Sequence, residues 1–76
     1  MVQIKDEILL KKIALCIKKI RSETTITLDD FYVDTGIHLA RIEIGQTNIT
    51  VSTLAKICSY FNISLKEFFT RLEDYK

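Results

Sequence analysis

Apolar residues between Leu9 and Ile20 recur every three or four positions, and this spacing most constrains the fold. It places one apolar stripe along a helix predicted over about residues 5–22, flanked by lysines. The stripe consists of Leu9, Ile13, Cys16, Ile17 and Ile20. The chain has no Pro, only two Gly and 47 % hydrophobic residues. Because it lacks the turn signals of small all-β proteins and is too apolar for disorder, we expect an all-α bundle.

Capping residues indicate the next two helices. Thr27, with Asp30 three positions later, begins a short second helix. Its expected core residues are Leu28, Phe31 and Tyr32. Thr35 is expected to cap a third helix that runs to about residue 44 and stops at Gly45. Only residues 33 and 34 then remain between these helices, which requires a very tight turn.

Two further helices complete the pattern. Thr50 caps a fourth helix, which ends at Asn62, a residue type that tolerates the left-handed conformation. The helical spacing in this segment involves Val51, Leu54, Ile57, Cys58 and Phe61. Ser64 and Glu67 form the capping box of a fifth helix. A chain of 76 residues supports one core, so residues 1–76 are expected to form a single domain.

Charge is distributed unevenly although the formal net charge is only +1. Residues 1–26 carry a net charge of +3 and residues 27–50 a net charge of −3. The first helix is therefore the cationic one. The total charge gives no strong attraction toward nucleic acid, so any binding depends on where the charges lie.

Metal, cofactor and catalytic sites are not indicated. Cys16 and Cys58 lie inside apolar helical patterns without metal-ligand spacing, so we expect two buried, reduced thiols. His38 is the only histidine and has no partner at nucleophile or ligand spacing. Because no pair of titratable groups has the spacing of a nucleophile and its base, we do not expect an enzyme. No stretch reaches about 18 consecutive apolar residues, and charges interrupt the first apolar run, so we expect a cytoplasmic protein.

Four segments together form a specific pattern. They are ITLDDF at residues 26–31, RIEIG at residues 41–45, Asn48 followed by the capping Thr50, and ISLKEFF at residues 63–69. In this order the chain resembles the lambda-repressor-like helix-turn-helix family, also called Cro/cI or XRE, over about residues 9–69. The resemblance implies a five-helix DNA-binding domain with its helix-turn-helix at helices two and three. The turn between those helices is shorter here than in the family and lacks the usual Gly-containing link.

In this family the third helix enters the major groove. The matching base-contact positions are Gly36, Ile37, His38 and Arg41. Arg41 is the strongest candidate, since its guanidinium can donate two hydrogen bonds to a guanine. The alternatives are a salt bridge from Arg41 to Asp34 and a surface role for His38.

Phosphate contacts and an ion pair also follow from the resemblance. The candidate phosphate contacts are Lys18, Lys19, Arg21, Thr27, Thr35 and Asn48. For the lysines, the alternative is a solvated helix face. Arg21 and Glu43 match family positions that form a partly buried ion pair, which would hold the third helix against the first.

The C-terminal segment suggests a dimer surface. Phe68 and Phe69 point about 100° apart on a helix, so one core cannot easily bury both. The candidate interface residues are Phe69, Leu72 and Tyr75, and the alternative is that they cover the side of the bundle. A symmetric dimer would place two third helices about 34 Å apart on a palindromic operator.

Two hypotheses follow. The first is a transcriptional regulator that binds double-stranded DNA as a homodimer without any cofactor. The second is a protein-interaction module of the same fold that has lost DNA binding, as the acidic segment at residues 27–50 allows. The position of Asp29, Asp30 and Asp34 discriminates between them, because carboxylates around Arg41 would repel phosphates.

Overall fold

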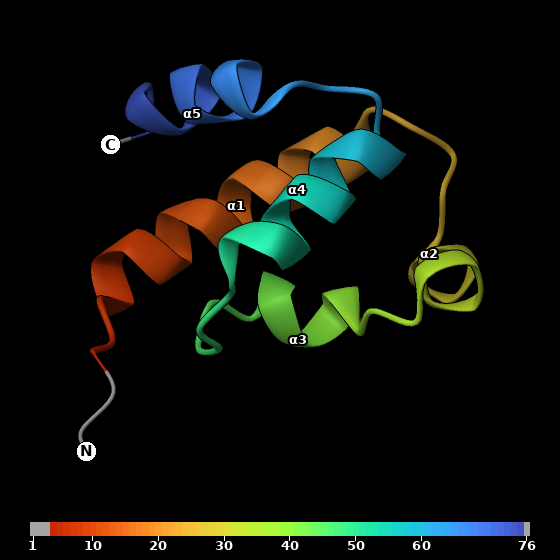
Figure 1. Ribbon diagram of the computed structural model, residues 1–76, viewed down its shortest axis with the longest axis horizontal. Helices are drawn as coiled ribbons and strands as arrows, with labels where there is room; N and C mark the ends of the chain where they lie inside the picture. Colours follow the sequence, from red (N-terminus) through yellow and green to blue (C-terminus); the bar gives the residue numbers. More distant parts are fainter. Residues whose placement is uncertain (1–3, 76) are drawn as a thin grey trace.

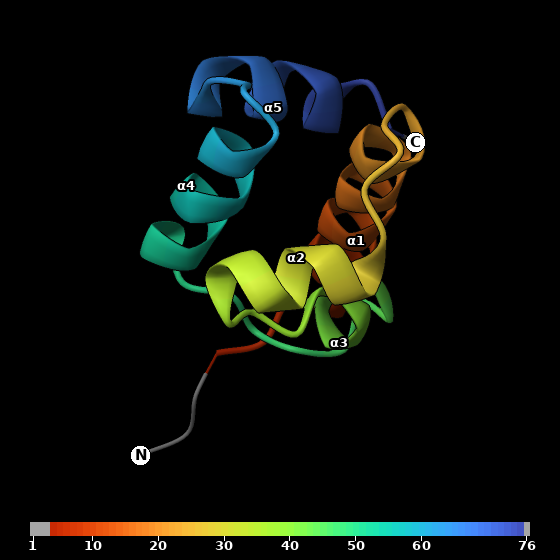
Figure 2. The ribbon, with the colours of Figure 1, turned by 90° about the vertical axis from the view of Figure 1, so that its right-hand side faces the viewer.

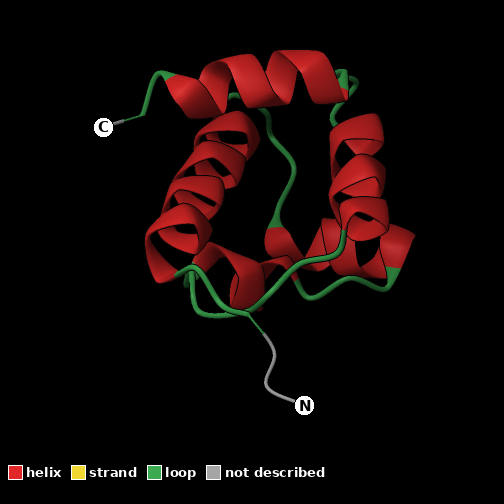
Figure 3. Ribbon diagram, turned by 60° about the vertical axis from the view of Figure 1, so that its left-hand side comes forward, coloured by secondary structure: helices red, strands yellow, loops and turns green. Residues whose placement is uncertain are grey.

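The computed structural model describes residues 4–75, in which helices are joined by short loops (Figure 1). In chain order the helices are α1 (Glu7–Ser22), α2 (Leu28–Thr35), α3 (Leu39–Glu43), α4 (Val51–Tyr60) and α5 (Leu65–Glu73). Every residue of this described range is helical or part of a loop or turn, with no strand (Figure 3). The predicted all-α fold of five helices is confirmed.

The fold has two distinct ends. α5 lies across one end, α2 and α3 lie together at the other, and α1 and α4 run between them (Figures 1 and 2). α1 contacts both α3 and α5. With 16 residues it is about 24 Å long, in a described molecule of 36 × 27 × 19 Å. α1 is therefore the element that connects the α3 end to the α5 end.

Side-chain caps determine where four of the helices begin. Thr27 and Asp30 form a reciprocal capping box, in which each side chain accepts a hydrogen bond from the other residue's N–H, at 3.0 and 3.1 Å. Thr50 and Ser64 each accept from the N–H three residues later. Both caps were predicted, but the Glu67 carboxylate accepts from Arg71 and does not complete the predicted capping box with Ser64. Asp6 caps α1 in the same way. These bonds satisfy N–H groups that a helix start leaves without partners.

The third helix begins later than predicted. Thr35 is the last residue of α2, and its hydroxyl donates to the Phe31 carbonyl at 2.7 Å instead of capping α3. Gly36 follows in the left-handed conformation, with φ of 75°, as is common after a helix end. The prediction that a Gly-containing link is missing is therefore wrong. Residues 36–38 form that link. The helix that follows is shorter than predicted, since α3 starts at Leu39 and has five residues.

The core largely follows the predicted pattern, except that Leu10 replaces Leu9 among the buried residues of α1. The buried residues are Leu10, Ile13, Ala14, Cys16, Ile17, Ile20, Phe31, Leu39, Ile42, Leu54, Ile57, Cys58, Phe68 and Leu72. Leu9 was predicted to be among them but is 42 % exposed, and Leu10 is buried instead. Leu10 is three positions before Ile13 and seven before Ile17, so it shares their side of the helix. Both cysteines are buried free thiols, as predicted.

Two other residues of the predicted apolar patterns are exposed. Tyr32 is 46 % exposed, because its neighbour Phe31 fills the core position on α2. Val51 is 70 % exposed, since it is the first residue of α4. Of the adjacent phenylalanines, Phe68 is fully buried and Phe69 is 44 % exposed, so one core does not bury both.

Gly45 allows α3 to end directly against α1. Its φ is 81°, which confirms it as the predicted stop of the third helix. A Cβ added here would lie 3.2 Å from the Lys11 Cα and 3.4 Å from the Ala14 Cβ. The absence of a side chain at this position therefore sets how closely the two helices approach.

Candidate nucleic-acid interface

The link between α2 and α3, together with the outer side of α3, carries the residues expected to contact bases. Gly36, His38 and Arg41 are exposed, whereas Ile37 is half-buried against the core. The Arg41 N–H donates to the His38 carbonyl at 3.1 Å, so these residues share the first turn of α3. His38 and Arg41 are thus the two polar side chains that this turn offers to a ligand.

His38 is held against α2 by an aromatic contact. The rings of His38 and Tyr32 are nearly parallel, at 28°, with their centroids 4.4 Å apart. This contact restricts the imidazole at the start of α3 and brings the exposed Tyr32 into the candidate interface. The exposure of Tyr32 could have been predicted from the sequence, because Tyr32 directly follows Phe31 and neighbouring helix positions cannot both point into one core.

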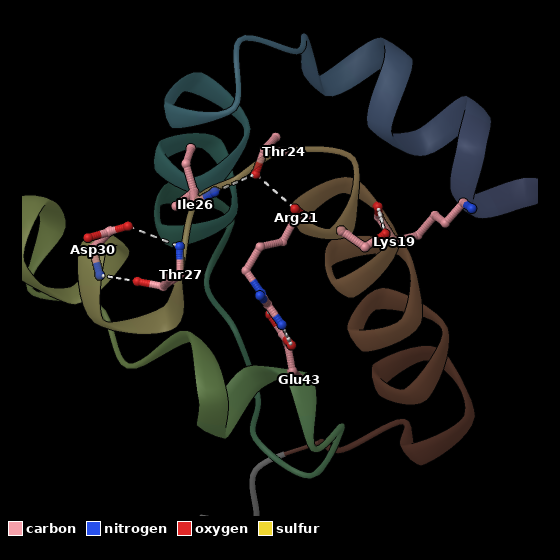
Figure 4. Close-up of polar contacts among 8 residues, drawn as sticks. Lys19, Arg21, Thr24, Ile26, Thr27, Asp30 and Glu43 are labelled. Carbon is pink, nitrogen blue, oxygen red and sulfur yellow. Dashed lines mark hydrogen bonds and ion pairs between the residues drawn. The ribbon is translucent and has the colours of Figure 1, made fainter.

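An ion pair joins α3 to α1, as the family resemblance implied. The Arg21 Nε and Nη2 donate to the two Glu43 carboxylate oxygens at 2.8 and 3.0 Å (Figure 4). The side chains are only 21 % and 8 % exposed. Hydrogen bonding to Glu43 raises the pKa of the Arg21 guanidinium above its ordinary value. This two-bond geometry fixes the end of α3 and thereby the direction of its outer side.

Comparison with known protein families agrees with this arrangement. The family model of the Cro/C1-type HTH DNA-binding domain matches residues 17–74. The chain belongs to this helix-turn-helix family. The match includes the link at residues 36–38 and both partners of the ion pair. No protein of curated function matches the chain significantly in sequence.

The acidic residues of this helix-turn-helix domain leave Arg41 free. Asp34 accepts a hydrogen bond from the Tyr60 hydroxyl of α4, and Asp30 belongs to the capping box. The bond to Asp34 raises the pKa of Tyr60. Within residues 4–75 no ion pair involves Arg41, so the alternative salt bridge to Asp34 is not formed. The carboxylates of Asp30 and Asp34 thus accept hydrogen bonds from partners other than Arg41.

The three uncharged candidate phosphate contacts, like Arg21, already have partners inside the domain. The Thr27 hydroxyl is used in the capping box, and the Thr35 hydroxyl both donates to Phe31 and accepts from the Ile37 N–H. The Asn48 amide nitrogen donates to the Ile4 carbonyl at 3.1 Å, which attaches the segment before α1 to the loop after α3. Of the three, Asn48 keeps a second N–H for another acceptor.

The basic candidates on α1 differ in direction. Lys18 and Lys19 are both exposed. Figure 4 shows the Lys19 side chain extending away from Glu43 and toward α5. Arg21 directs two of its nitrogens to Glu43. Lys19 and Arg21 therefore do not present their charges together beside α3.

The predicted dimer residues occupy different environments. Phe69 is exposed, Leu72 is a core residue at 6 % exposure, and Tyr75 is half-buried against the core. Leu72 therefore points into the bundle, because it follows the fully buried Phe68 by one helical turn. Phe69 remains the exposed apolar side chain of this group.

Two other kinds of site were searched for in the described part of the chain. No group of three or more His, Cys, Asp or Glu side chains there is arranged to hold a metal ion. Among the helices found between residues 4 and 75, none combines the length and the apolar character needed to cross a bilayer.

Proposed function

We propose that this protein is a sequence-specific transcriptional regulator that places α3 in the major groove of double-stranded DNA. The observation that carries the proposal is the exposed Arg41 on α3, which has no ion-pair partner within residues 4–75. The Arg21–Glu43 pair behind it holds α3 to α1. A fixed helix with a free guanidinium fits the guanine edge in the major groove, where such a contact discriminates by about 1–3 kcal/mol.

His38 and Gly36 supply the remaining contacts at the start of the helix. Stacked on Tyr32, the His38 imidazole is positioned to donate to a base or a phosphate. Gly36 has no side chain and open space where one would be, so the backbone of the link can come close to the duplex. Ile37 contributes through the part of its side chain that the core leaves exposed, against a thymine methyl group.

Phosphate contacts are expected to be few. The free N–H of Asn48 is the best placed, since Thr27 and Thr35 use their hydroxyls for helix ends. A chain of net charge +1 gains little from counterion release at one site. Affinity must therefore come from shape, base contacts and a second copy of the chain.

A homodimer on a palindromic operator meets that requirement. Two copies related by a twofold axis would present two α3 helices about 34 Å apart, one DNA turn. Phe69, exposed on α5, is the proposed centre of the dimer contact, and the half-buried Tyr75 is proposed to contribute its exposed part. A regulator of this kind acts in the cytoplasm, requires no cofactor and performs no catalytic step.

Selection of bound sequences from random duplexes tests the proposal. The wild-type chain is expected to return a palindromic sequence, and Arg41→Ala is expected to lose the preference for one guanine in each half-site. Lys56→Ala, which removes a positive charge from the exposed side of α4, is the matched control and is expected to return the wild-type sequence. An unchanged preference in Arg41→Ala would show that Arg41 does not read a base.

A second candidate function is a protein-interaction module of the same fold. The short α3 favours it, because five residues present little polar surface, and the adjoining Ile44 is 64 % exposed. The net charge of −3 over residues 27–50 points the same way. If selection returns no preferred sequence and binding to duplex DNA does not weaken with salt, this second function replaces the first.

A further inference from the structure

The outward side of α1 carries an apolar and basic surface that the DNA-binding site does not use. Ile8 is 73 % exposed and Leu15 is 54 % exposed. They are seven positions apart, two turns along the same side of the helix. Lysines occupy the positions around them. We call this surface the α1 outer face, formed by Ile8, Lys11, Lys12, Leu15, Lys18 and Lys19.

Hollows lie on both sides of Leu15. One of about 390 Å³ lies between Leu15 and Tyr75, with the stems of Lys18 and Lys19 along its edge. The other, of about 200 Å³, lies between Leu15 and Ile44. The Tyr75 hydroxyl donates to the Leu15 carbonyl at 3.3 Å, which fixes the aromatic wall of the larger hollow. Leu15 is therefore a central apolar ridge with an apolar wall facing it on each side.

The charge around these hollows is positive. The ion pairs within residues 4–75 involve Arg21 and Arg71, and none involves a lysine of the α1 outer face. Glu43 borders the smaller hollow, but both of its oxygens accept from Arg21. Four uncompensated lysines around exposed Leu and Ile side chains favour a ligand that is apolar along one stripe and acidic beside it.

A second copy of the chain does not meet this requirement. In an antiparallel pairing centred on Leu15, Lys11 and Lys12 of one copy would face Lys18 and Lys19 of the other. In a parallel pairing each lysine would face its own counterpart. Like charges opposite one another at an interface disfavour association, so self-association through this surface is opposed by charge.

We propose that the α1 outer face binds an acidic amphipathic helix of a partner protein. Apolar side chains of that helix, three or four positions apart, would enter the hollows on the two sides of Leu15. Its carboxylates would meet the lysines at the rim, where Lys19 extends toward α5 (Figure 4). This binding does not depend on the proposed DNA contacts of Arg41 and would give the domain a second partner.

The test uses a fluorescein-labelled peptide of about 20 residues, long enough to form a helix, with Leu every three or four positions and Glu between. Fluorescence anisotropy measures its affinity for the full chain. A peptide of the same composition with the Leu residues scattered around the helix is the peptide control. The amphipathic peptide is expected to bind, less tightly at higher salt, and the scattered one to bind at least about tenfold more weakly.

Three variants identify the surface. Leu15→Ala keeps helix propensity and is expected to weaken peptide binding at least about fivefold. The double change Lys18→Glu with Lys19→Glu is expected to weaken it at least about tenfold. Val33→Ala, which truncates an 80 % exposed valine on α2, is the matched control and is expected to bind like wild type. Circular dichroism verifies that each variant is folded.

Several outcomes would overturn the proposal. Equal binding of both peptides, or no effect of Leu15→Ala, would show that the hollows hold no apolar side chains. A wild-type dimer that Leu15→Ala dissociates in sedimentation would identify a second copy as the occupant. If the peptide does not bind and the Lys18→Glu, Lys19→Glu double variant binds duplex DNA more weakly than wild type, the surface is a DNA contact. Loss of sequence selection in Arg41→Ala leaves this inference untouched, so the two proposals fail separately.

Discussion

Arg21 on α1 and Glu43 at the end of α3 are joined by two parallel hydrogen bonds of 2.8 and 3.0 Å. Glu43 is the more deeply placed partner, with a side chain only 8 % exposed. The carboxylate therefore depends on Arg21 for its hydrogen bonds. α3 has five residues and too few internal bonds to be stable alone, so this pair and the core residues Leu39 and Ile42 hold it in place.

Replacing Arg21 by Met should destabilise the fold markedly. The apolar stem is retained, but the poorly hydrated Glu43 carboxylate loses both donors. We expect the free energy of unfolding to fall by about 2–3 kcal/mol, between the values for exposed and fully buried pairs. Urea unfolding followed by circular dichroism measures the change.

Arg71→Met is the control for that experiment. Arg71 pairs with Glu23 and Glu67 at 3.0 and 3.2 Å, but all three side chains are 36 % exposed or more. We expect a loss of at most about 1 kcal/mol, because water and salt screen exposed pairs. Equal losses in the two variants would mean that burial of Glu43 has no energetic consequence.

Gly45→Ala should be more harmful than Gly36→Ala. Both glycines are left-handed, with φ of 81° and 75°, so each substitution carries a penalty of about 1–2 kcal/mol. At Gly36 the new methyl group meets nothing within 4 Å, whereas at Gly45 it lies 3.2 Å from the Lys11 Cα. Gly45→Ala must therefore also push α3 away from α1. We expect a total loss of at least about 2 kcal/mol, with amide shifts near Lys11 in NMR spectra of this variant only. Equal losses would show that the helices separate freely.

The helix starts were predictable because caps act locally. The hydroxyls of Thr27, Thr50 and Ser64 each accept a hydrogen bond from the N–H three residues later. Residue type and local position are enough to predict such a bond. Thr35 has the same residue type but bonds backward to the Phe31 carbonyl. A threonine can do either, and the choice is made by the length of α2 and by Gly36. The predicted start of α3 was therefore too early, and the predicted helix was too long.

The local spacing of apolar residues does not determine which side of α1 is buried. Leu9, Leu10 and Leu15 are all leucines on one helix, yet Leu10 is buried and the other two are exposed. Spacing from Ile13 and Ile17 admits more than one apolar stripe, and the neighbours of α1 decide which is covered. The contact between Tyr32 and His38 was unpredictable for a similar reason, because it depends on the path of the link at residues 36–38. The family resemblance predicted the partly buried Arg21–Glu43 pair correctly, since it compares whole positions of the fold and does not depend on local spacing.

The bond between Tyr60 and Asp34 predicts a pH dependence. It raises the pKa of Tyr60 above its ordinary value of 10.0, chiefly by hydrogen bonding to the carboxylate. A folded-state pKa above the unfolded one means that this bond stabilises the fold fully below pH 10 and is lost as pH rises through the raised value. NMR titration should therefore show Tyr60 ionising later than a free tyrosine.

Asp34→Asn isolates the cause of that shift. It removes the negative charge and is expected to lower the Tyr60 pKa toward 10.0. The pKa of Tyr75 is also raised, but mainly by burial, so it should stay unchanged in this variant and serves as the internal control. A Tyr60 pKa that does not fall in Asp34→Asn would contradict the bond between α2 and α4.

The two cysteines should report unfolding of the core. Cys16 on α1 and Cys58 on α4 are 1 % and 2 % exposed, and burial raises the pKa of both thiols, so little reactive thiolate forms near neutral pH. We expect both to react slowly with a disulfide reagent in the native chain and rapidly in urea, at a rate that follows the unfolded fraction. Ser59→Cys places a third thiol on the exposed side of α4, next to Cys58, and should react at once. Fast labelling of three thiols in that variant without urea would show that the core between α1 and α4 opens in the folded state.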